Sequence, residues 1–557
     1  MIAQKKFRVK LPRPAPLYSA LLFAALALPS PATAQTSPGA INRDRLDQNP
    51  VIQKKAPPVR KKRRARRPRP PAAPPPAVAV FRLEKVALEN SSLPPEQIEA
   101  AWRPFIGRAV DATLLTQLTA AIAQLYTRSD IALYAVVIPA QTPADGLLRL
   151  SATEGYVNDI TVVGTDRRKL VRGIVARASR LKEDRPLRKS TLDRVAALIG
   201  DIPGATAEIG FETDPQSGAS RAIVKVAGKS AQGSISIDRR GITLLGSTHA
   251  QMDIQGNSVF VGADQLRLSI LTSTAEDSIQ YQSISYQAPV DGDGSTLAVQ
   301  ASRQRTRATL LPLDGRAKSY GVQFAHPLWR GSRRSLYLTL GLDGTESHNA
   351  LLGYTLSNDR VRTARAGASY AAVNAHRLVP VGVTVSRGIG ALGARATPGQ
   401  AEPGFTKVTL KANAAEAVDD DVAIRAALFG QWTGDRLPAS EQAALGGDEF
   451  GRAYRASAIA GDIGLAGSVE LAWRPSAIKA PFAGSELYLF ADGGSVRMRA
   501  REWAKADRWS LASAGAGARV AIANSNVLEI EAVRGLTDPV FYAPGKSRVV
   551  VSLRSSF

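Results

Sequence analysis

Residues 335–343 read SLYLTLGLD, a run in which leucine occupies every second position and a small or polar residue lies between. Successive side chains of a β-strand point to opposite faces of its sheet, so this run predicts a strand with one apolar and one polar face. The same alternation occurs at 266–270, 422–432 and 528–532. Strands of this kind form either a soluble β-sandwich or a membrane β-barrel.

Strand length favours the barrel. Residues 230–557 contain about sixteen alternating segments of about 8–14 residues, which suits tilted strands that cross a bilayer and is long for a sandwich. An even number of strands lets a single chain close without a free edge, as a bilayer requires. We therefore expect residues 230–557 to form a transmembrane β-barrel of about 16 antiparallel strands, with a long loop at 434–465.

Two smaller units precede the barrel region. Residues 80–155 contain an alternating strand, two segments with helical spacing and two further strands, and residues 156–229 repeat this order in shorter form. A strand, two helices and two strands, occurring twice, predict two small α+β domains in tandem.

The first 79 residues have a different composition. Residues 1–34 join a basic start to an apolar run and to Ala32-Thr33-Ala34, which predicts a cleaved export signal peptide. Residues 35–79 are basic and rich in proline, so we expect an extended linker. The chain has 72 Lys and Arg against 48 Asp and Glu, a formal charge of +24, and more than half of the excess lies in these 79 residues. Because the signal peptide and the linker carry this excess rather than a folded face, no nucleic-acid partner is expected.

The sequence predicts no catalytic, metal or cofactor site. The chain has no cysteine, which excludes disulfides and Cys-ligated metals, and its four histidines lie far apart in sequence. Gly388, Gly390 and Gly393 match a dinucleotide-binding pattern, but Pro398 follows where that pattern needs a helix. No nucleophile lies beside a base in a recognisable motif, so we expect a protein that is not an enzyme.

The end of the first α+β unit carries a family pattern. Residues 139–141 read Pro-Ala-Gln, residues 145–146 read Asp-Gly and residues 154–155 read Glu-Gly, which gives the motif residues Pro139, Gln141, Gly146 and Gly155. This pattern resembles the first POTRA (polypeptide-transport-associated) domain of two-partner-secretion transporters, the haemolysin-activator type of outer-membrane protein. The resemblance implies that residues 80–155 and 156–229 are POTRA domains.

The long loop carries a second pattern of the same family. Residues 445–455 read LGGDEFGRAYR, and they include Gly451, Arg452, Ala453 and Tyr454; Gly461, Asp462 and Gly464 follow. This resembles the Gly-Gly, Val-Arg-Gly-aromatic and Gly-Asp-x-Gly elements of the family's sixth extracellular loop, which folds back into the pore. The chain keeps the arginine and the aromatic residue but lacks the valine and the central glycine.

Phe490 and Asp492 match the family's Phe-x-Asp on the next strand but one. Alternation places both side chains on the lumen side of the barrel, together with Tyr488. An arginine on a loop inside the lumen loses part of its hydration, so a wall carboxylate is its natural partner. We therefore expect Arg452 to contact Asp492.

The last alternating segment resembles an assembly signal. Val549, Val551, Leu553 and Phe557 share one face of this segment. An apolar last strand ending in an aromatic residue resembles the signal that the outer-membrane barrel-assembly machinery binds. The resemblance thus implies a barrel-assembly partner during biogenesis.

The family resemblance covers residues 80–557. It implies a transporter in the outer membrane of a Gram-negative bacterium, surrounded by outer-membrane lipid, with POTRA domains in the periplasm that bind a secreted cargo protein and with no cofactor. Members often carry a short plug helix before the linker, and residues 41–49 are the candidate here.

Three alternatives remain open. A barrel-assembly insertase shares the loop motif but generally carries more than two POTRA units. A passive porin explains the barrel but needs no POTRA domain. A soluble periplasmic adhesin built on a β-sandwich explains the alternation alone.

Overall fold

The structure is a computed structural model that describes residues 81–141, 146–214, 216–239, 248–273, 279–308, 313–502, 504–523, 525–539 and 546–557. The predicted signal peptide at 1–34, the linker at 35–79 and the plug candidate at 41–49 lie outside the described residues. The described chain divides into two compact units, one of residues 81–200 and 205–228 and one of residues 201–204 and 229–557. In the described residues, no helix is both long and apolar enough to cross a membrane.

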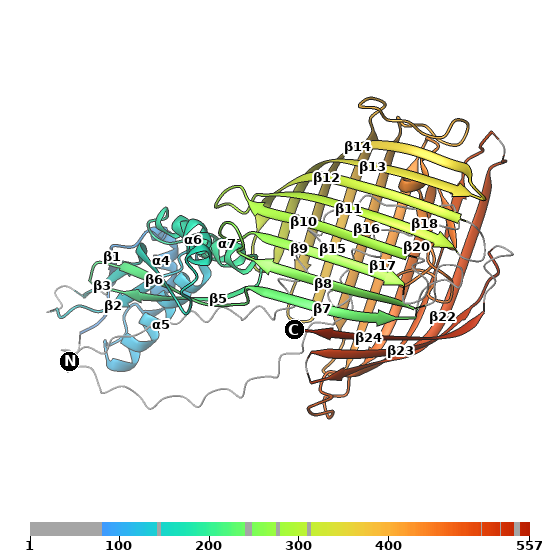
Figure 1. The fold of residues 1–557 in the computed structure, drawn as a ribbon. Helices are drawn as coiled ribbons and strands as arrows, with labels where there is room; N and C mark the ends of the chain where they lie inside the picture. The colour runs from blue at the N-terminus through green and yellow to red at the C-terminus, as the bar shows by residue number, and fades with distance from the viewer. Residues whose placement is uncertain are drawn as a thin grey trace. The chain divides into compact units, whose positions relative to one another are not determined.

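The first unit begins with an α+β domain (Figure 1). Its elements are β1 (Lys85–Glu89), α4 (Pro95–Trp102), a 3-10 turn (Arg103–Phe105), α5 (Ala112–Arg128), β2 (Tyr134–Val137) and β3 (Leu147–Glu154). The sheet order is β1-β3-β2, with β1 parallel and β2 antiparallel to β3. Helix α5 begins at Asp111, whose carboxylate accepts the amide of Leu114 at 2.6 Å. Its buried face, with Leu118 and Ile122, packs in the core of the domain.

The second domain of this unit repeats the arrangement. Its elements are β4 (Tyr156–Val163), α6 (Arg168–Ala178), a 3-10 turn (Ser179–Lys182), α7 (Lys189–Gly200), β5 (Ala205–Thr213) and β6 (Ala219–Gly228). The sheet order is β4-β6-β5, again with one parallel and one antiparallel pair. The expected tandem of α+β domains before a barrel is therefore confirmed.

The motif residues of the first domain lie around its central strand: Pro139, Gln141, Gly146 and Gly155. The amide side chain of Gln141 pairs with the backbone of Arg149 in β3, donating to its carbonyl at 2.7 Å and accepting from its amide at 2.9 Å. Gly146 has φ of +67°, a left-handed value that favours glycine, and it starts the turn into β3. The carbonyl of Gly155 accepts the amide of Leu187 in the second domain at 2.9 Å.

A lysine joins the two α+β domains. The ammonium of Lys189, the first residue of α7, donates to the carbonyls of Tyr126, Thr127 and Ser129 at 2.7, 2.9 and 2.6 Å. These carbonyls lie at the C-terminal end of α5, where the helix dipole favours a cation. Lys189 therefore caps a helix of the neighbouring domain.

We expect Lys189→Met to loosen this contact. Losing a cation and its hydrogen bonds at a helix end costs about 1–2 kcal/mol, so amides of residues 127–131 should exchange with solvent about tenfold faster. Hydrogen exchange of the full chain in detergent, read by mass spectrometry, measures this. Lys182→Met, an exposed lysine of the same domain, is the control. Equal exchange in the two variants would show that Lys189 does not hold the junction.

In the described residues of the second unit, sixteen strands close into a barrel in which each strand is antiparallel to its neighbours (Figure 1). They are β7 (Ala231–Asp238), β8 (His249–Asn257), β9 (Gln265–Ser273), β10 (Ile279–Pro289), β11 (Thr296–Ala308), β12 (Leu313–Arg330), β13 (Arg334–Leu351), β14 (Tyr354–Val373), β15 (Arg377–Gly388), β16 (Thr406–Ala417), β17 (Val422–Thr433), β20 (Ile463–Trp473), β21 (Glu486–Met498), β22 (Asp507–Ile522), β23 (Asn526–Gly535) and β24 (Ser547–Ser556). The expected barrel is confirmed, and the soluble sandwich is wrong because the sheet closes on itself.

The two faces of the wall follow the alternation in the sequence. Leu338, Leu340 and Leu342 of β13 point outward and are 43%, 59% and 56% exposed, whereas Tyr337 and Thr345 point into the barrel and are buried. An apolar outward band with a polar interior is the pattern of a barrel that lies in lipid.

Three strands are longer than the sequence indicated. Strands β12, β13 and β14 have 18, 18 and 20 residues, against the expected limit of about 14. The sequence pattern weakens in their outer parts because charged residues such as Arg316 and Lys318 replace apolar residues on the outward face. The backbones of neighbouring strands remain hydrogen-bonded in these outer parts, although the outward side chains are no longer apolar.

The barrel closes where the last strand meets the first. Strand β24 pairs with β7 from Ser552 opposite Asp238 to Ser556 opposite Ser234. Beyond the last pair, the amide of Phe557 donates to the carbonyl of Gly233 at 2.9 Å, and the amide of Gly233 donates back at 3.0 Å. Gly233 leaves room for the Phe557 ring, which would lie 2.3 Å from a Cβ at this position. The motif residues Val549, Val551 and Leu553 point outward.

Candidate functional site in the barrel lumen

The loop between β17 and β20 lies inside the barrel. This lumen loop, residues 434–462, contains a 3-10 turn (Ala439–Glu441) and the short antiparallel strands β18 (Ala443–Leu445) and β19 (Ile459–Gly461). Its apolar side chains pack against inward-facing side chains of the wall strands β20–β24. The expected long loop therefore ends three residues earlier, because β20 begins at Ile463, and the small β18–β19 hairpin was not predicted.

A glycine lets the loop tip approach the wall. Gly451 has φ of +84°, and a Cβ there would lie 2.6 Å from the side chain of Leu511 on β22. Its amide donates to a carboxylate oxygen of Asp492 on β21 at 2.7 Å. A side chain at this position would therefore strain the backbone and push the loop tip away from the wall.

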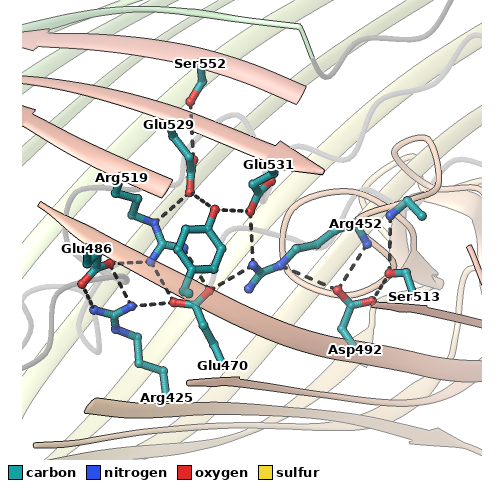
Figure 2. Close-up of polar contacts among 12 residues, drawn as sticks. Arg425, Arg452, Glu470, Glu486, Asp492, Ser513, Arg519, Glu529, Glu531 and Ser552 are labelled. Carbon is teal, nitrogen blue, oxygen red and sulfur yellow. Dashed lines mark hydrogen bonds and ion pairs between the residues drawn. The ribbon is translucent and has the colours of Figure 1, made fainter. Parts of the chain in front are cut away.

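The next residue, Arg452, extends its side chain along the wall (Figure 2). One terminal nitrogen lies 3.0 Å from Glu470 of β20 and 3.2 Å from Glu531 of β23, and Nε lies 3.7 Å from Asp492. The guanidinium also lies over the ring of Phe490, with Cζ 4.1 Å from the centroid, a distance at which the ring attracts a cation. Arg452 is only 5% exposed, so these contacts replace most of its hydration.

The expected contact between Arg452 and Asp492 is therefore the longest of three ion pairs. Asp492 instead accepts the backbone amides of Gly451 and Arg452 at 2.7 and 3.4 Å and the hydroxyl of Ser513 at 2.5 Å. Its carboxylate thus holds the backbone of the loop tip, while Glu470 and Glu531 hold the arginine head.

Further charges continue the network along the wall (Figure 2). Arg519 of β22 contacts Glu470 and Glu486 at 2.8 and 2.6 Å, and its Nε contacts Glu529 at 2.8 Å. Arg425 of β17 contacts the same Glu470 and Glu486 at 2.5 and 2.7 Å. Buried charges of this kind are tolerated only when paired, so each member depends on the others.

Tyr454 and Ala453 complete the loop tip. The Tyr454 ring is buried, and its hydroxyl lies 2.5 Å from the Thr537 carbonyl and accepts the Thr537 amide at 3.0 Å. The amide of Ala453 donates to the hydroxyl of Ser513 at 3.4 Å. These contacts tie the tip to β22 and to the segment after β23.

The Gly-Asp-x-Gly element closes the base of the lumen loop. Asp462, fully buried, accepts the amides of Leu437 and Arg499 at 2.8 Å each and the guanidinium of Arg501 at 2.7 Å. A Cβ at Gly461 would lie 2.8 Å from the backbone of the neighbouring strand β21. A Cβ at Gly464 would lie 2.6 Å from the Cβ of Ala443, a residue of the same loop. Both glycines therefore permit close packing where the loop ends and β20 begins.

A second anchor, which the sequence analysis missed, holds the first part of the loop. Glu441 lies 2.7 Å from Arg365 of β14 and 2.8 Å from Lys407 of β16, and all three side chains are buried. Arg365 also contacts Asp343 at 3.1 Å. Burial alone would raise the pKa of Glu441, but Arg365 and Lys407 lower it below its ordinary value, so the carboxylate stays ionised.

The arrangement is a set of reversible ionic contacts between a loop and a wall. The chemistry it supports is attachment and release of the loop, since carboxylates and guanidinium groups can exchange partners without a covalent step. In the part of the chain that the structure describes, no group of three or more His, Cys, Asp or Glu could hold a metal ion.

Sequence reasoning missed Glu470, Glu486, Arg519 and Ser513. Their only signal was a charged or polar residue at an inward position of an alternating strand, a position that in most barrels simply contacts water. Their meeting depends on strand register, such as Asp492 opposite Ser513 and Phe490 opposite Glu470.

We expect Arg452→Met to release the loop tip. Without the arginine, Glu470, Glu531 and Asp492 lose a shared cation, which costs about 3–5 kcal/mol in a buried site. Amides of residues 446–458 should then exchange about 100-fold faster or more, as measured by mass spectrometry on the full chain. Arg333→Met, an exposed arginine just before β13, should leave the exchange of these amides unchanged.

A double variant tests the cause. Adding Glu531→Gln to Arg452→Met removes one of the acids left without its cation, so part of the protection should return. If the two substitutions instead add their effects, charge pairing does not hold the tip.

Comparisons with curated proteins match transporters. The chain is 21% identical over 309 residues to the heme/hemopexin transporter protein HuxB of Haemophilus influenzae strain 86-028NP, covering 54% of each protein. It is 22% identical over 432 residues to the outer membrane transporter CdiB of Dickeya dadantii strain 3937, covering 75% of this chain and 76% of that protein. The chain thus spans about half the length of HuxB.

The fold is also similar to a solved structure. CdiB from Escherichia coli matches with a TM-score of 0.69 and 18% identity, covering 97% of this chain and 98% of that chain. At this identity the likeness is one of fold.

Family profiles match both parts of the chain. The ShlB-type POTRA domain matches residues 81–155, and the haemolysin secretion/activation protein ShlB/FhaC/HecB matches residues 218–520. Since the second match covers more than half of the sequence, the chain belongs to the ShlB/FhaC/HecB family of haemolysin secretion/activation proteins.

Proposed function

We propose that the protein exports a partner polypeptide from the periplasm to the cell surface or the medium by two-partner secretion. The observation that carries this proposal is a loop held inside the barrel by ionic contacts of its Gly451-Arg452-Ala453-Tyr454 tip. A passive porin needs no such attachment and no POTRA domain, and an insertase generally carries more POTRA domains.

The POTRA domains capture the cargo in this proposal. Each of their three-stranded sheets has two edge strands, β1 and β2 in the first domain and β4 and β5 in the second. An extended polypeptide binds such an edge by adding a strand, through backbone hydrogen bonds that depend little on its sequence. This mode suits an unfolded cargo.

The lumen loop then controls passage. Its tip and first part are attached to the wall through Arg452 and Glu441, and its base is attached to the segment after β21 through Asp462. The cargo passes when the loop is displaced, because the loop otherwise occupies the lumen beside β20–β23. The protein acts without catalysis, and folding of the cargo outside the cell supplies the direction of transport.

The direct test of the proposal is co-expression with a large secreted polypeptide, where a gene neighbouring that of this chain encodes one. Cargo should reach the medium only when the full chain is present, and deletion of residues 81–228 should stop secretion while the barrel still inserts. Secretion that persists without these residues would leave a porin-like channel as the better explanation.

A cross-link tests loop displacement. The natural chain has no cysteine, so Ala453→Cys with Ser513→Cys, whose backbone amide and hydroxyl lie 3.4 Å apart, gives one reactive pair for a short bis-maleimide. Linking should lower secretion at least about tenfold if the tip has to leave the wall. The control pair Ser495→Cys and Ser510→Cys lies opposite across β21 and β22, within the wall itself. Full secretion from the linked Ala453 and Ser513 variant would rule out loop displacement.

A deletion in the last strand tests how the barrel is assembled. We propose that β24 binds the barrel-assembly machinery through its outward Val549, Val551, Leu553 and Phe557 before it pairs with β7. Deleting residues 549–557 removes this surface and the closing pairs, so the protein should be absent from the outer membrane. The readout is a band whose gel mobility changes on heating, and Phe557→Tyr is the conservative control. Normal insertion of the truncated chain would contradict the proposal.

A further inference from the structure

The outward face of the barrel changes from apolar to basic at one level. On β11, Leu297 and Val299 face outward and Arg303 and Arg305 follow on the same face. The same change occurs on β12 and β14, and together the three strands form a surface that we call the basic belt. Its members are Arg303, Arg305, Arg307, Arg316, Lys318, Arg360 and Arg362.

The belt lies at the cell-surface end of the barrel. Strand β7 follows the second POTRA domain after two residues, so its start marks the periplasmic end, and successive strands alternate in direction. Lys318 and Arg362 are the thirteenth and twelfth residues from the periplasmic ends of β12 and β14. Arg303 and Arg305 are the eighth and tenth residues of the shorter β11, and their pairing with Lys318 and Arg316 places them at the same level. A tilted strand of about 9–11 residues spans the bilayer, so the belt lies at the level of the outer headgroups.

Like charges oppose each other across the strands of the belt. Arg303 is the cross-strand neighbour of Lys318, and Arg305 is the neighbour of Arg316. Like charges in directly opposed positions destabilise a sheet. A surface built this way is therefore favoured when an anion lies between the strands.

Few acidic residues balance these charges. In the described residues of this surface on β10–β14, the acids are Asp314, 3.0 Å from Arg316 and opposite Arg307, and Glu346, 2.9 Å from Arg362 and opposite Lys318 and Arg360. Arg362 also lies over the ring of Tyr320, with Cζ 5.4 Å from the centroid, at the upper limit of the apolar band. Aromatic residues at this level are typical of the membrane interface.

We propose that the basic belt binds the phosphate groups of the phosphorylated glycolipid that forms the outer leaflet of the outer membrane. Arginine forks bind phosphate oxygens in pairs, and a cluster of basic residues beside a membrane attracts anionic headgroups. Phosphate between β11 and β12 offsets the repulsion of the opposed pairs, and the acyl chains lie against the apolar face below. This binding is independent of cargo export.

The test uses the full chain in a non-ionic detergent, with phosphorylated lipid A as the probe. Arg305→Gln with Arg316→Gln removes one opposed pair, and Arg333→Gln with Arg334→Gln removes two exposed charges at the periplasmic end of β13 as the matched control. Titration of the barrel's heat-denaturation temperature with lipid gives an apparent affinity. The first variant should bind about tenfold more weakly or worse, and the control should match the natural chain.

Two further measurements distinguish specific binding of the lipid from a general effect of charge on stability. Without lipid, the first variant should resist heat at least as well as the natural chain. It lacks the repulsion between Arg305 and Arg316, and the exposed Arg316–Asp314 ion pair that it also loses contributes little. Lipid A without phosphate should stabilise the natural chain much less than the phosphorylated form.

The proposal fails if both variants lose affinity equally, or if the phosphate-free lipid binds as well. It also fails if phosphatidylglycerol or inorganic phosphate, at equal phosphate concentration, competes as well as lipid A. If the first variant does not insert, Arg303→Gln with Lys318→Gln, the neighbouring opposed pair, is judged by the same criteria.

Discussion

The structure depends on one constraint, namely that backbone N–H and C=O groups inside a bilayer have to find hydrogen-bond partners within the protein. The pairing of β24 with β7 closes the sheet, so that no edge strand is left with unpaired backbone groups. Closure also creates a space shielded from lipid, and this space is where the chain can keep charges that would be costly on the outer wall. The ionic network around Arg452 exists because the wall encloses it.

Inside that space, neighbouring acidic residues hold different parts of the loop, because their side chains differ in length and position. The short carboxylate of Asp492 reaches the backbone amides of the loop tip, while the longer side chains of Glu470 and Glu531 reach the guanidinium. Phe490 faces the same arginine through its ring. One arginine thus depends on three strands, and Glu470, which also contacts Arg519 and Arg425, links the loop to the rest of the wall.

The sequence predicted the barrel well because alternation with a period of two survives in every strand that lies in lipid. It underestimated β12–β14, since hydrogen bonding continues where the apolar face ends. For the site, the motif marked Arg452 and Asp492, and the family resemblance supplied the expectation that they meet. The roles of Glu470, Glu531 and Glu441 could not be predicted from the sequence. Strand register and the path of the loop bring these residues to their arginine partners, and neither leaves a local signal in the sequence.

The two anchors of the lumen loop have a mechanical meaning. Arg365, which holds Glu441, is on β14, and Glu531, which holds Arg452, is on β23, seven strands away around a wall of sixteen. The loop therefore braces the barrel along a chord close to its diameter. A barrel is a thin shell that resists stretching along its hydrogen bonds but flattens easily, and a strut across it fixes the cross-section. In the export that we propose, release of either end of the loop would remove this strut, so displacement of the loop would be accompanied by a change in the outline of the barrel.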